Sequence, residues 1–160
     1  IGAYPGLGAE ERGQGEAIAH NLFQMSSLKV PIISVVIGEG ASGGALGIGL
    51  CDIMLMMENT WYSVISPEGC ASILFRDASR AEDAAEALRP IPSDLVEMGI
   101  CDGIIEEPNG GAHRDFEASA KLLKKALFNH LDNLSTIEKE DFLERRILRY
   151  DKLCYFTDLS

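Results

Sequence analysis

The sequence predicts an α/β fold, and three observations lead to this expectation. Short apolar runs that suit strands alternate with segments whose apolar residues recur every three or four positions, as in helices. The strand-like runs are continuously apolar, which is typical of strands covered on both faces. With 160 residues, of which 46% are hydrophobic, the chain is long enough for about one domain with a buried core.

The first half of the chain is expected to hold one helix, three strands and a glycine-rich stretch. Apolar residues from Ile18 to Leu28 recur at helical spacing, and the β-branched run that follows them suits a buried strand. The glycine-rich stretch over residues 38–49 becomes helix-like from Gly43. We expect a helix over residues 9–28 and strands over residues 30–37, 52–57 and 61–66.

Three short helices and a fourth strand are expected next. Pro67 stands where proline is favoured, in the first turn of a helix, and Gly99 is placed to end a helix. We expect helices over residues 67–76, 81–88 and 92–98, a strand over residues 102–106 and a turn over residues 108–111.

Two amphipathic helices are expected at the end of the chain. The first covers residues 115–131, and the second begins at Ser135, whose spacing from Glu138 matches a capping box. In the first helix, the residues expected to face inward are Phe116, Ala120, Leu123, Leu127 and Leu131. In the second helix, they are Phe142, Leu143, Ile147 and Leu148, which lie among the basic residues Arg145, Arg146 and Arg149.

Charge and cysteine content narrow the possible functions. The net charge of −11 would repel nucleic acid and anionic membranes, so neither is an expected partner. No apolar run approaches the roughly 20 residues of a membrane span, and no signal-like segment opens the chain, so we expect a cytoplasmic protein. None of the four cysteines lies within four residues of another, which disfavours a metal site, and three are expected in the core.

The glycine-rich stretch is the strongest candidate for a functional site. It follows a buried strand and leads into a helix, whose first N–H groups have no partner inside the helix and carry a partial positive charge. Adjacent glycines, such as Gly43 and Gly44, remove the side chains that would keep a ligand from those N–H groups. The stretch therefore predicts a site for an anion or a developing oxyanion. The alternative is that the glycines serve only close packing.

The same stretch also matches the serine-hydrolase pattern G-x-S-x-G, with Ser42 as the nucleophile. Asp102 and His113 follow in the order that a catalytic triad of this class requires, although they lie close together in the sequence. A serine hydrolase is therefore a competing hypothesis, and a non-catalytic assembly module is a third.

Five sequence blocks together resemble one protein family. The blocks are GAYPG at residues 2–6, EERGQGEAIA at 10–19, VIGEGASGGALGIG at 36–49, YSVISPEGCASIL at 62–74 and EEPNGGAHRD at 106–115. In this order they resemble the carboxyltransferase α-subunit family of acetyl-CoA carboxylase. The resemblance covers essentially the whole chain and loosens after about residue 134.

The resemblance implies a crotonase-type fold, in which ββα units form layers and backbone amides form oxyanion holes. We expect residues 1–134 to form the crotonase-like domain, with its N-terminal part missing, and residues 135–160 to form a helical extension. The loop-like opening of the chain, rich in glycine and without methionine, agrees with a missing N-terminal part.

The resemblance also implies a reaction and its participants. The reaction transfers a carboxyl group from carboxybiotin, on the biotin carboxyl carrier protein, to acetyl-CoA and forms malonyl-CoA for fatty-acid synthesis. A carboxyltransferase β subunit completes an α2β2 heterotetramer and carries the zinc, so this chain is expected to hold no metal. Biotin is the implied cofactor, and ATP binding is implied for the whole enzyme.

By the pattern of the family, the backbone amides of Gly43 and Gly44 would hold the ureido oxygen of biotin. Gly69 would shape the biotin pocket, whereas Arg12 and Arg114 would meet a carboxylate or phosphate or else form surface ion pairs. Ala41 departs from the pattern, because many relatives are expected to have glycine at this position.

Overall fold

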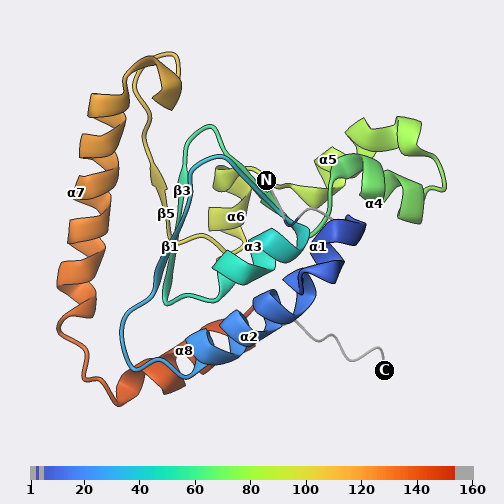
Figure 1. Cartoon of the computed structure of the whole chain (residues 1–160). Helices are drawn as coiled ribbons and strands as arrows, with labels where there is room; N and C mark the ends of the chain where they lie inside the picture. Colours follow the sequence, from blue (N-terminus) through green and yellow to red (C-terminus); the bar gives the residue numbers. More distant parts are fainter. Residues whose placement is uncertain (1–2, 4–5, 154–160) are drawn as a thin grey trace, which may run out of the picture.

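The computed structural model describes residues 3 and 6–153, which form layers of helices around parallel strands (Figure 1). One sheet contains β1 (Ile33–Val36), β3 (Ile53–Met57) and β5 (Gly103–Ile105) in the order β1-β3-β5. A second sheet pairs β2 (Glu39–Ala41) with β4 (Trp61–Ser63), and all pairings are parallel. The expected alternation of strands and helices is confirmed.

Helices connect and cover the strands (Figure 1). The α-helices are α1 (Leu7–Glu11), α2 (Gln14–Ser26), α3 (Ser42–Gly49), α4 (Pro67–Leu74), α5 (Ala81–Leu88), α6 (Pro92–Glu97), α7 (Phe116–Leu134) and α8 (Asp141–Asp151), and the 3-10 helices are η1 (Ala78–Arg80) and η2 (Ala112–Arg114).

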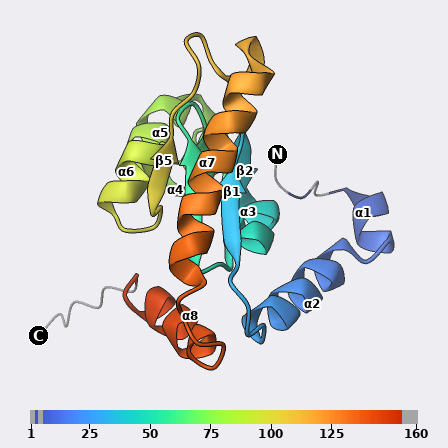
Figure 2. The ribbon, with the colours of Figure 1, turned by 90° about the vertical axis from the view of Figure 1, so that its left-hand side faces the viewer.

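The core lies on both faces of the larger sheet, because successive side chains of the central strand β3 point to opposite faces. On one face Leu55 and Met57 pack with Ile105 and with apolar side chains of α7, the helix that covers this face (Figure 2). On the other face Met56 packs with Val36, Leu95 and Cys101. The expectation of strands covered on both faces therefore holds for β3.

The helices α4 and α5 form a smaller cluster beside the main body (Figure 1). Cys70 and Ala71 of α4 pack against Ala84 of α5 in a separate apolar core. Ser66 caps α4 by accepting a hydrogen bond from the N–H of Gly69 at 3.2 Å, and Pro67 takes the first helical position as expected. These local signals explain why the sequence placed α4 correctly.

The helix expected over residues 9–28 is in fact two helices, α1 and α2. Gly13 separates them with φ of 75°, in the left-handed region that glycine adopts without steric cost. No residue of α2 is fully buried, and its apolar residues Ile18, Leu22 and Met25 are only partly covered.

The packing face expected for α7 is also corrected. Leu123 packs on the sheet as expected, together with Leu122 and Ala126, whereas Phe116 is 77% exposed and Leu131 is 41% exposed. The expected capping box at Ser135 is wrong, because α7 continues to Leu134 and the hydroxyl of Ser135 donates to the carbonyl of Asp132.

Helix α8 begins at Asp141 and buries one of the side chains that the sequence pattern had grouped as basic. Arg146 is 3% exposed, while Ile147 and Leu148, expected to face inward, are 63% and 47% exposed. Phe142 is buried, as expected. Residues 135–153 thus contact the main body, and the domain boundary at residue 134 stays a prediction.

Three of the four cysteines, Cys51, Cys70 and Cys101, are buried and free, which confirms their expected place in the core. Cys154 lies outside the residues that the structure describes.

Candidate active site

The candidate site lies where the short strand β2 ends and helix α3 begins. Ser42, the first residue of α3, has φ of 51°. Side chains rarely adopt this left-handed conformation, and strain of this kind gathers at functional sites. The helix follows β2 without an intervening loop, so Gly43 and Gly44 lie in the first turn of α3.

The backbone amides of Gly43 and Gly44 are available to a ligand. First-turn N–H groups have no acceptor within their own helix. Across the part of the chain that the structure describes, neither amide donates to a group outside α3, and Ala41 offers no side-chain cap. The geometry thus provides the pair of adjacent donors that the glycine pattern predicted, and whether they bind a ligand stays a prediction.

Helix α2 limits the space beside Gly43. A Cβ atom at Gly43 would lie 3.5 Å from Cδ1 of Ile18 and 3.6 Å from Cβ of Ala3, which is ordinary contact. A larger, branched side chain at this position would press against Ile18 and crowd the amides of the first turn.

Two other glycines of the stretch serve packing, because they make room for Tyr62. Gly40 pairs with Tyr62 across the smaller sheet, and a Cβ at Gly40 would lie 2.6 Å from the tyrosine ring. A Cβ at Gly49 would lie 2.5 Å from the tyrosine hydroxyl. The packing interpretation of the stretch is therefore correct for Gly40 and Gly49, whereas the ligand site at Gly43 and Gly44 stays a prediction. The role of Tyr62 could not be predicted from the sequence, since a tyrosine in an apolar run carries no local signal of it.

Gly69 lies in the first turn of α4, which begins at the same end of the smaller sheet as α3 and its candidate amides. Because β2 and β4 are parallel and paired from Glu39↔Trp61 to Ala41↔Ser63, the starts of α3 and α4 leave the same end of this sheet. The N–H of Gly69 is used by the cap on Ser66, and a Cβ at Gly69 would lie 2.9 Å from Ile65. Close packing explains this glycine, and its role in a biotin pocket stays a prediction.

The two candidate arginines lie on different sides of the molecule. Arg12 ends α1, whereas Arg114 lies in η2 beside the start of α7, across the larger sheet from α3 (Figures 1 and 2). Both are exposed, and neither forms an ion pair with another described residue. The structure therefore does not bring Arg114 to Gly43 and Gly44.

The serine-hydrolase hypothesis is wrong, because its three residues do not meet. Asp102 precedes β5 and binds the N–H of Met54 at 2.7 Å and Arg149 at 2.8 Å. His113 follows the other end of β5, in η2, on the α7 side of the sheet (Figure 1). Ser42 thus has neither the base nor the acid of a triad beside it.

A groove of about 720 Å³ lies elsewhere, at the carboxyl end of the larger sheet. Glu58 and Glu107 line it together with His113, so its acidic character suits an anionic ligand poorly. Over the described ranges, no cluster of three or more His, Cys, Asp or Glu side chains is arranged to hold a metal ion. The helices of this same part of the chain are all too short or too polar to cross a membrane.

The sequence of this chain is similar to those of curated proteins. The acetyl-coenzyme A carboxylase carboxyl transferase subunit alpha of Exiguobacterium sibiricum is 56% identical over 152 residues, which are 95% of this chain and 49% of that protein. The chain thus spans about half the length of the curated relatives it matches.

Solved structures share the fold. A chain of a Pseudomonas malonate decarboxylase hetero-tetramer in complex with coenzyme A superposes with a TM-score of 0.68 at 17% identity, over 91% of this chain and 57% of that chain. The transcarboxylase 12S structure with methylmalonyl-coenzyme A and methylmalonic acid superposes with a TM-score of 0.57 at 25% identity, over 74% of this chain and 25% of that chain.

The expected crotonase-type α/β fold is therefore confirmed. The family model described as acetyl co-enzyme A carboxylase carboxyltransferase-like matches residues 1–154. On this match, which takes in the glycine-rich turn and every element described above, the chain belongs to the acetyl co-enzyme A carboxylase carboxyltransferase-like family.

Proposed function

We propose that this chain belongs to the α subunit of an acetyl-CoA carboxylase carboxyltransferase, which transfers a carboxyl group from carrier-bound biotin to acetyl-CoA. The observation that carries the proposal is the pair of free amides at Gly43 and Gly44, in a chain of this family. Carboxyl transfer develops negative charge on oxygen atoms, and fixed N–H donors stabilise such charge best where they need no reorganisation.

The donor set fits the ureido group of biotin. The ureido oxygen is a hydrogen-bond acceptor, and the first turn of α3 offers two adjacent donors together with the positive end of a helix. Carrier-bound biotin, in its carboxylated form, would supply the carboxyl group to be transferred. Gly43 and Gly44 would hold the ureido oxygen, and the absence of side chains at both positions leaves their amides open to it.

The first turn of α3, residues 42–45, carries no acidic or basic side chain that could act as a general base. Elsewhere in the chain, burial raises the pKa of the Cys51 and Cys101 thiols, which keeps both protonated. We infer that the described residues of this turn contribute positioning and electrostatic stabilisation to the transfer.

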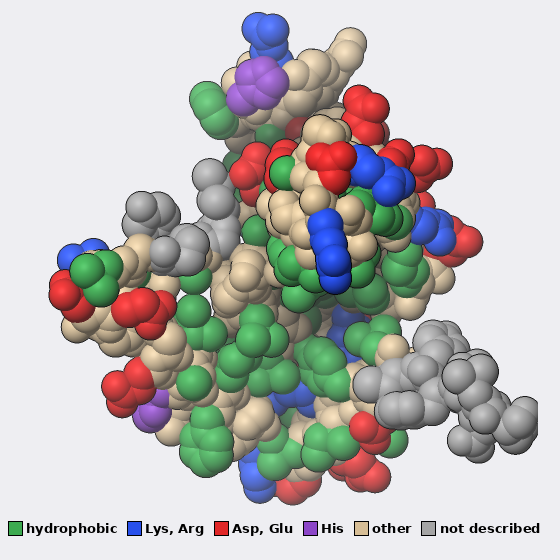
Figure 3. All heavy atoms as spheres, turned by 90° about the vertical axis from the view of Figure 1, so that its right-hand side faces the viewer, with side chains coloured by type: hydrophobic (Ala, Val, Ile, Leu, Met, Phe, Trp, Pro, Cys, Tyr) green, Lys and Arg blue, Asp and Glu red, His purple; other side chains and the backbone are tan. Residues whose placement is uncertain are grey.

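A partner subunit completes the proposed site. Figure 3 shows apolar side chains gathered over the face from which α1 and α4 project. Large exposed apolar side chains of this kind mark interaction surfaces. We infer that a β subunit and the biotin carrier protein approach here, so that the site is shared between subunits, as in the expected α2β2 assembly. The exposed large apolar residues of α1 to α4 are Leu7, Phe23, Leu46, Ile48, Ile73 and Leu74.

The test is a Gly43→Val substitution in the full α subunit, purified with its β subunit. The branched side chain would meet Ile18 and cover the amides, so turnover of malonyl-CoA with a biotin analogue should fall about 100-fold or more, the scale of a lost oxyanion donor. Association with the β subunit should persist, as judged by size-exclusion chromatography.

Two control variants make the result specific. Gly47→Val places a side chain in the same helix where a Cβ would meet nothing within 4 Å, and should retain most activity. Ser42→Ala removes the hydroxyl that a hydrolase would need, and should also retain activity. Unchanged turnover in Gly43→Val would remove these amides from the mechanism.

A further inference from the structure

Helix α3 has few side chains with which to fix its own position. Its sequence is SGGALGIG, and Ala45 is its only buried residue. Leu46 and Ile48, its two large side chains, are 58% and 42% exposed. Burial of apolar side chains is what normally locks a helix onto a sheet, so the orientation of α3 must depend on other contacts.

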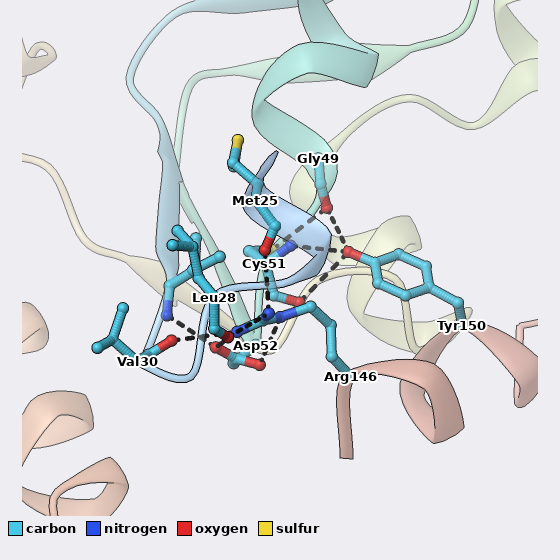
Figure 4. Close-up of polar contacts among 9 residues, drawn as sticks. Met25, Leu28, Val30, Gly49, Cys51, Asp52, Arg146 and Tyr150 are labelled. Carbon is cyan, nitrogen blue, oxygen red and sulfur yellow. Dashed lines mark hydrogen bonds and ion pairs between the residues drawn. The ribbon is translucent and has the colours of Figure 1, made fainter. Parts of the chain in front are cut away.

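Hydroxyl groups from three other elements bind the carbonyls of α3. The hydroxyl of Tyr62, in β4, donates to the carbonyl of Ala45 at 2.6 Å. The hydroxyl of Tyr150, in α8, donates to the carbonyl of Gly49 at 2.6 Å and accepts the N–H of Cys51 at 2.8 Å (Figure 4). Ser34, in β1, donates to the carbonyl of Ile48.

We propose that Tyr62 and Tyr150 are positioning residues for the reaction, because they hold the carbonyls of α3 and thereby aim the amides of Gly43 and Gly44. The inference rests on the proposed function of those amides. An eight-residue helix is about 12 Å long and moves as a rod, so restraints on its later carbonyls restrain its first turn. A misplacement of about 1 Å at a reacting centre can cost about 100-fold in rate.

Both hydroxyls keep the proton that they donate. Burial raises the pKa of Tyr62 to about 12 and also raises that of Tyr150. The two tyrosines therefore remain donors throughout the neutral range, and the restraint on α3 does not titrate there.

The test uses Tyr150→Phe and, separately, Tyr62→Phe in the full α subunit, purified with its β subunit. Each change removes one hydroxyl and keeps the ring that fills the space. With malonyl-CoA and biocytin as substrates, we expect kcat to fall about 10- to 100-fold while KM for malonyl-CoA stays unchanged. Hydrogen–deuterium exchange should become faster over residues 42–50 and stay unchanged in β3.

Ser135→Ala is the matched control. The Ser135 hydroxyl donates to the carbonyl of Asp132 at 2.7 Å, at the end of α7, and so makes the same kind of bond on another helix. This variant should leave kcat and the exchange of residues 42–50 at wild-type values.

Three outcomes would overturn the inference. Wild-type kcat and exchange in both tyrosine variants would show that the hydroxyls do not hold α3. A fall in kcat that accompanies faster exchange throughout the chain would show a general structural role. An inactive wild-type complex would contradict both the proposed function and the positioning role. An active wild-type complex with unaffected tyrosine variants would contradict the positioning role alone.

Discussion

At the scale of single residues, Arg146 makes more side-chain hydrogen bonds than any other residue that the structure describes. Its guanidinium forms an ion pair with Asp52 at 2.9 Å and donates to the carbonyls of Met25, Leu28 and Val30 (Figure 4). Asp52 in turn accepts the N–H of Ile32 at 2.7 Å. One arginine therefore ties α8 to the end of α2 and to the segments before β1 and β3.

Replacing Arg146 with methionine should destabilise the chain by about 3–5 kcal/mol, because it leaves the buried carboxylate of Asp52 without its cation. The free energy of unfolding from guanidinium chloride titration measures this loss. Arg145→Met is the control on the same helix, where the side chain is exposed, and should stay within about 0.5 kcal/mol of wild type. Equal effects of the two substitutions would contradict the role of the buried ion pair.

The sequence could not single out Arg146 among its neighbours. Charged residues normally face solvent, so the sequence pattern does not distinguish Arg146 from Arg145 and Arg149. The burial of Arg146 depends on Asp52, which lies 94 positions away, and on carbonyls freed where α2 ends. No pattern within α8 records those partners.

At the scale of elements, β2, α3 and β4 form one packed unit around the ring of Tyr62. Gly40 and Gly49 both lie where a side chain would meet this ring or its hydroxyl. Gly47 has open space beside it, and Gly43 makes only ordinary contacts. The glycines of one motif therefore divide into packing positions and positions that leave amides free.

Gly40→Ala should lower the free energy of unfolding by about 1–3 kcal/mol, since its Cβ would lie 2.6 Å from the Tyr62 ring. Gly47→Ala, in the open part of α3, should raise it by about 0.5–1 kcal/mol, because alanine favours a helix interior. Thermal and denaturant unfolding would measure both. A double-mutant cycle of Gly40→Ala with Tyr62→Ala should show coupling, and strict additivity would contradict the steric cause.

At the scale of the whole molecule, stability is expected to be uneven. Met54–Met57 of β3 are buried between two helical layers, whereas no residue of α2 is buried. Elements with few buried contacts open locally at low free-energy cost.

In this chain, the amides of α2 should therefore exchange with solvent much faster than those of β3. Hydrogen–deuterium exchange, read by mass spectrometry of peptides, measures the difference directly. Arg146→Met should accelerate exchange at the end of α2 more than in α4 and α5, which have their own apolar cluster. Protection of α2 equal to that of β3 would contradict this distribution of stability.

The sequence by itself determined the α/β class, the places of β3, α4, α5 and α6 and the free first turn of α3. Each of these depends on signals within a few residues: an apolar run, a capping serine with proline, or adjacent glycines. Gly43 and Gly44 could be found because a helix start leaves N–H groups free whatever packs around it.

Only the tertiary structure decided how these elements combine. It divided the strands into two sheets, turned α7 so that Phe116 is exposed, buried Arg146 and separated Asp102 from His113. It also brought Tyr62 and Tyr150 to the carbonyls of α3. The physical reason is that these arrangements depend on contacts between residues far apart in the chain, whose energies no local pattern of side chains contains.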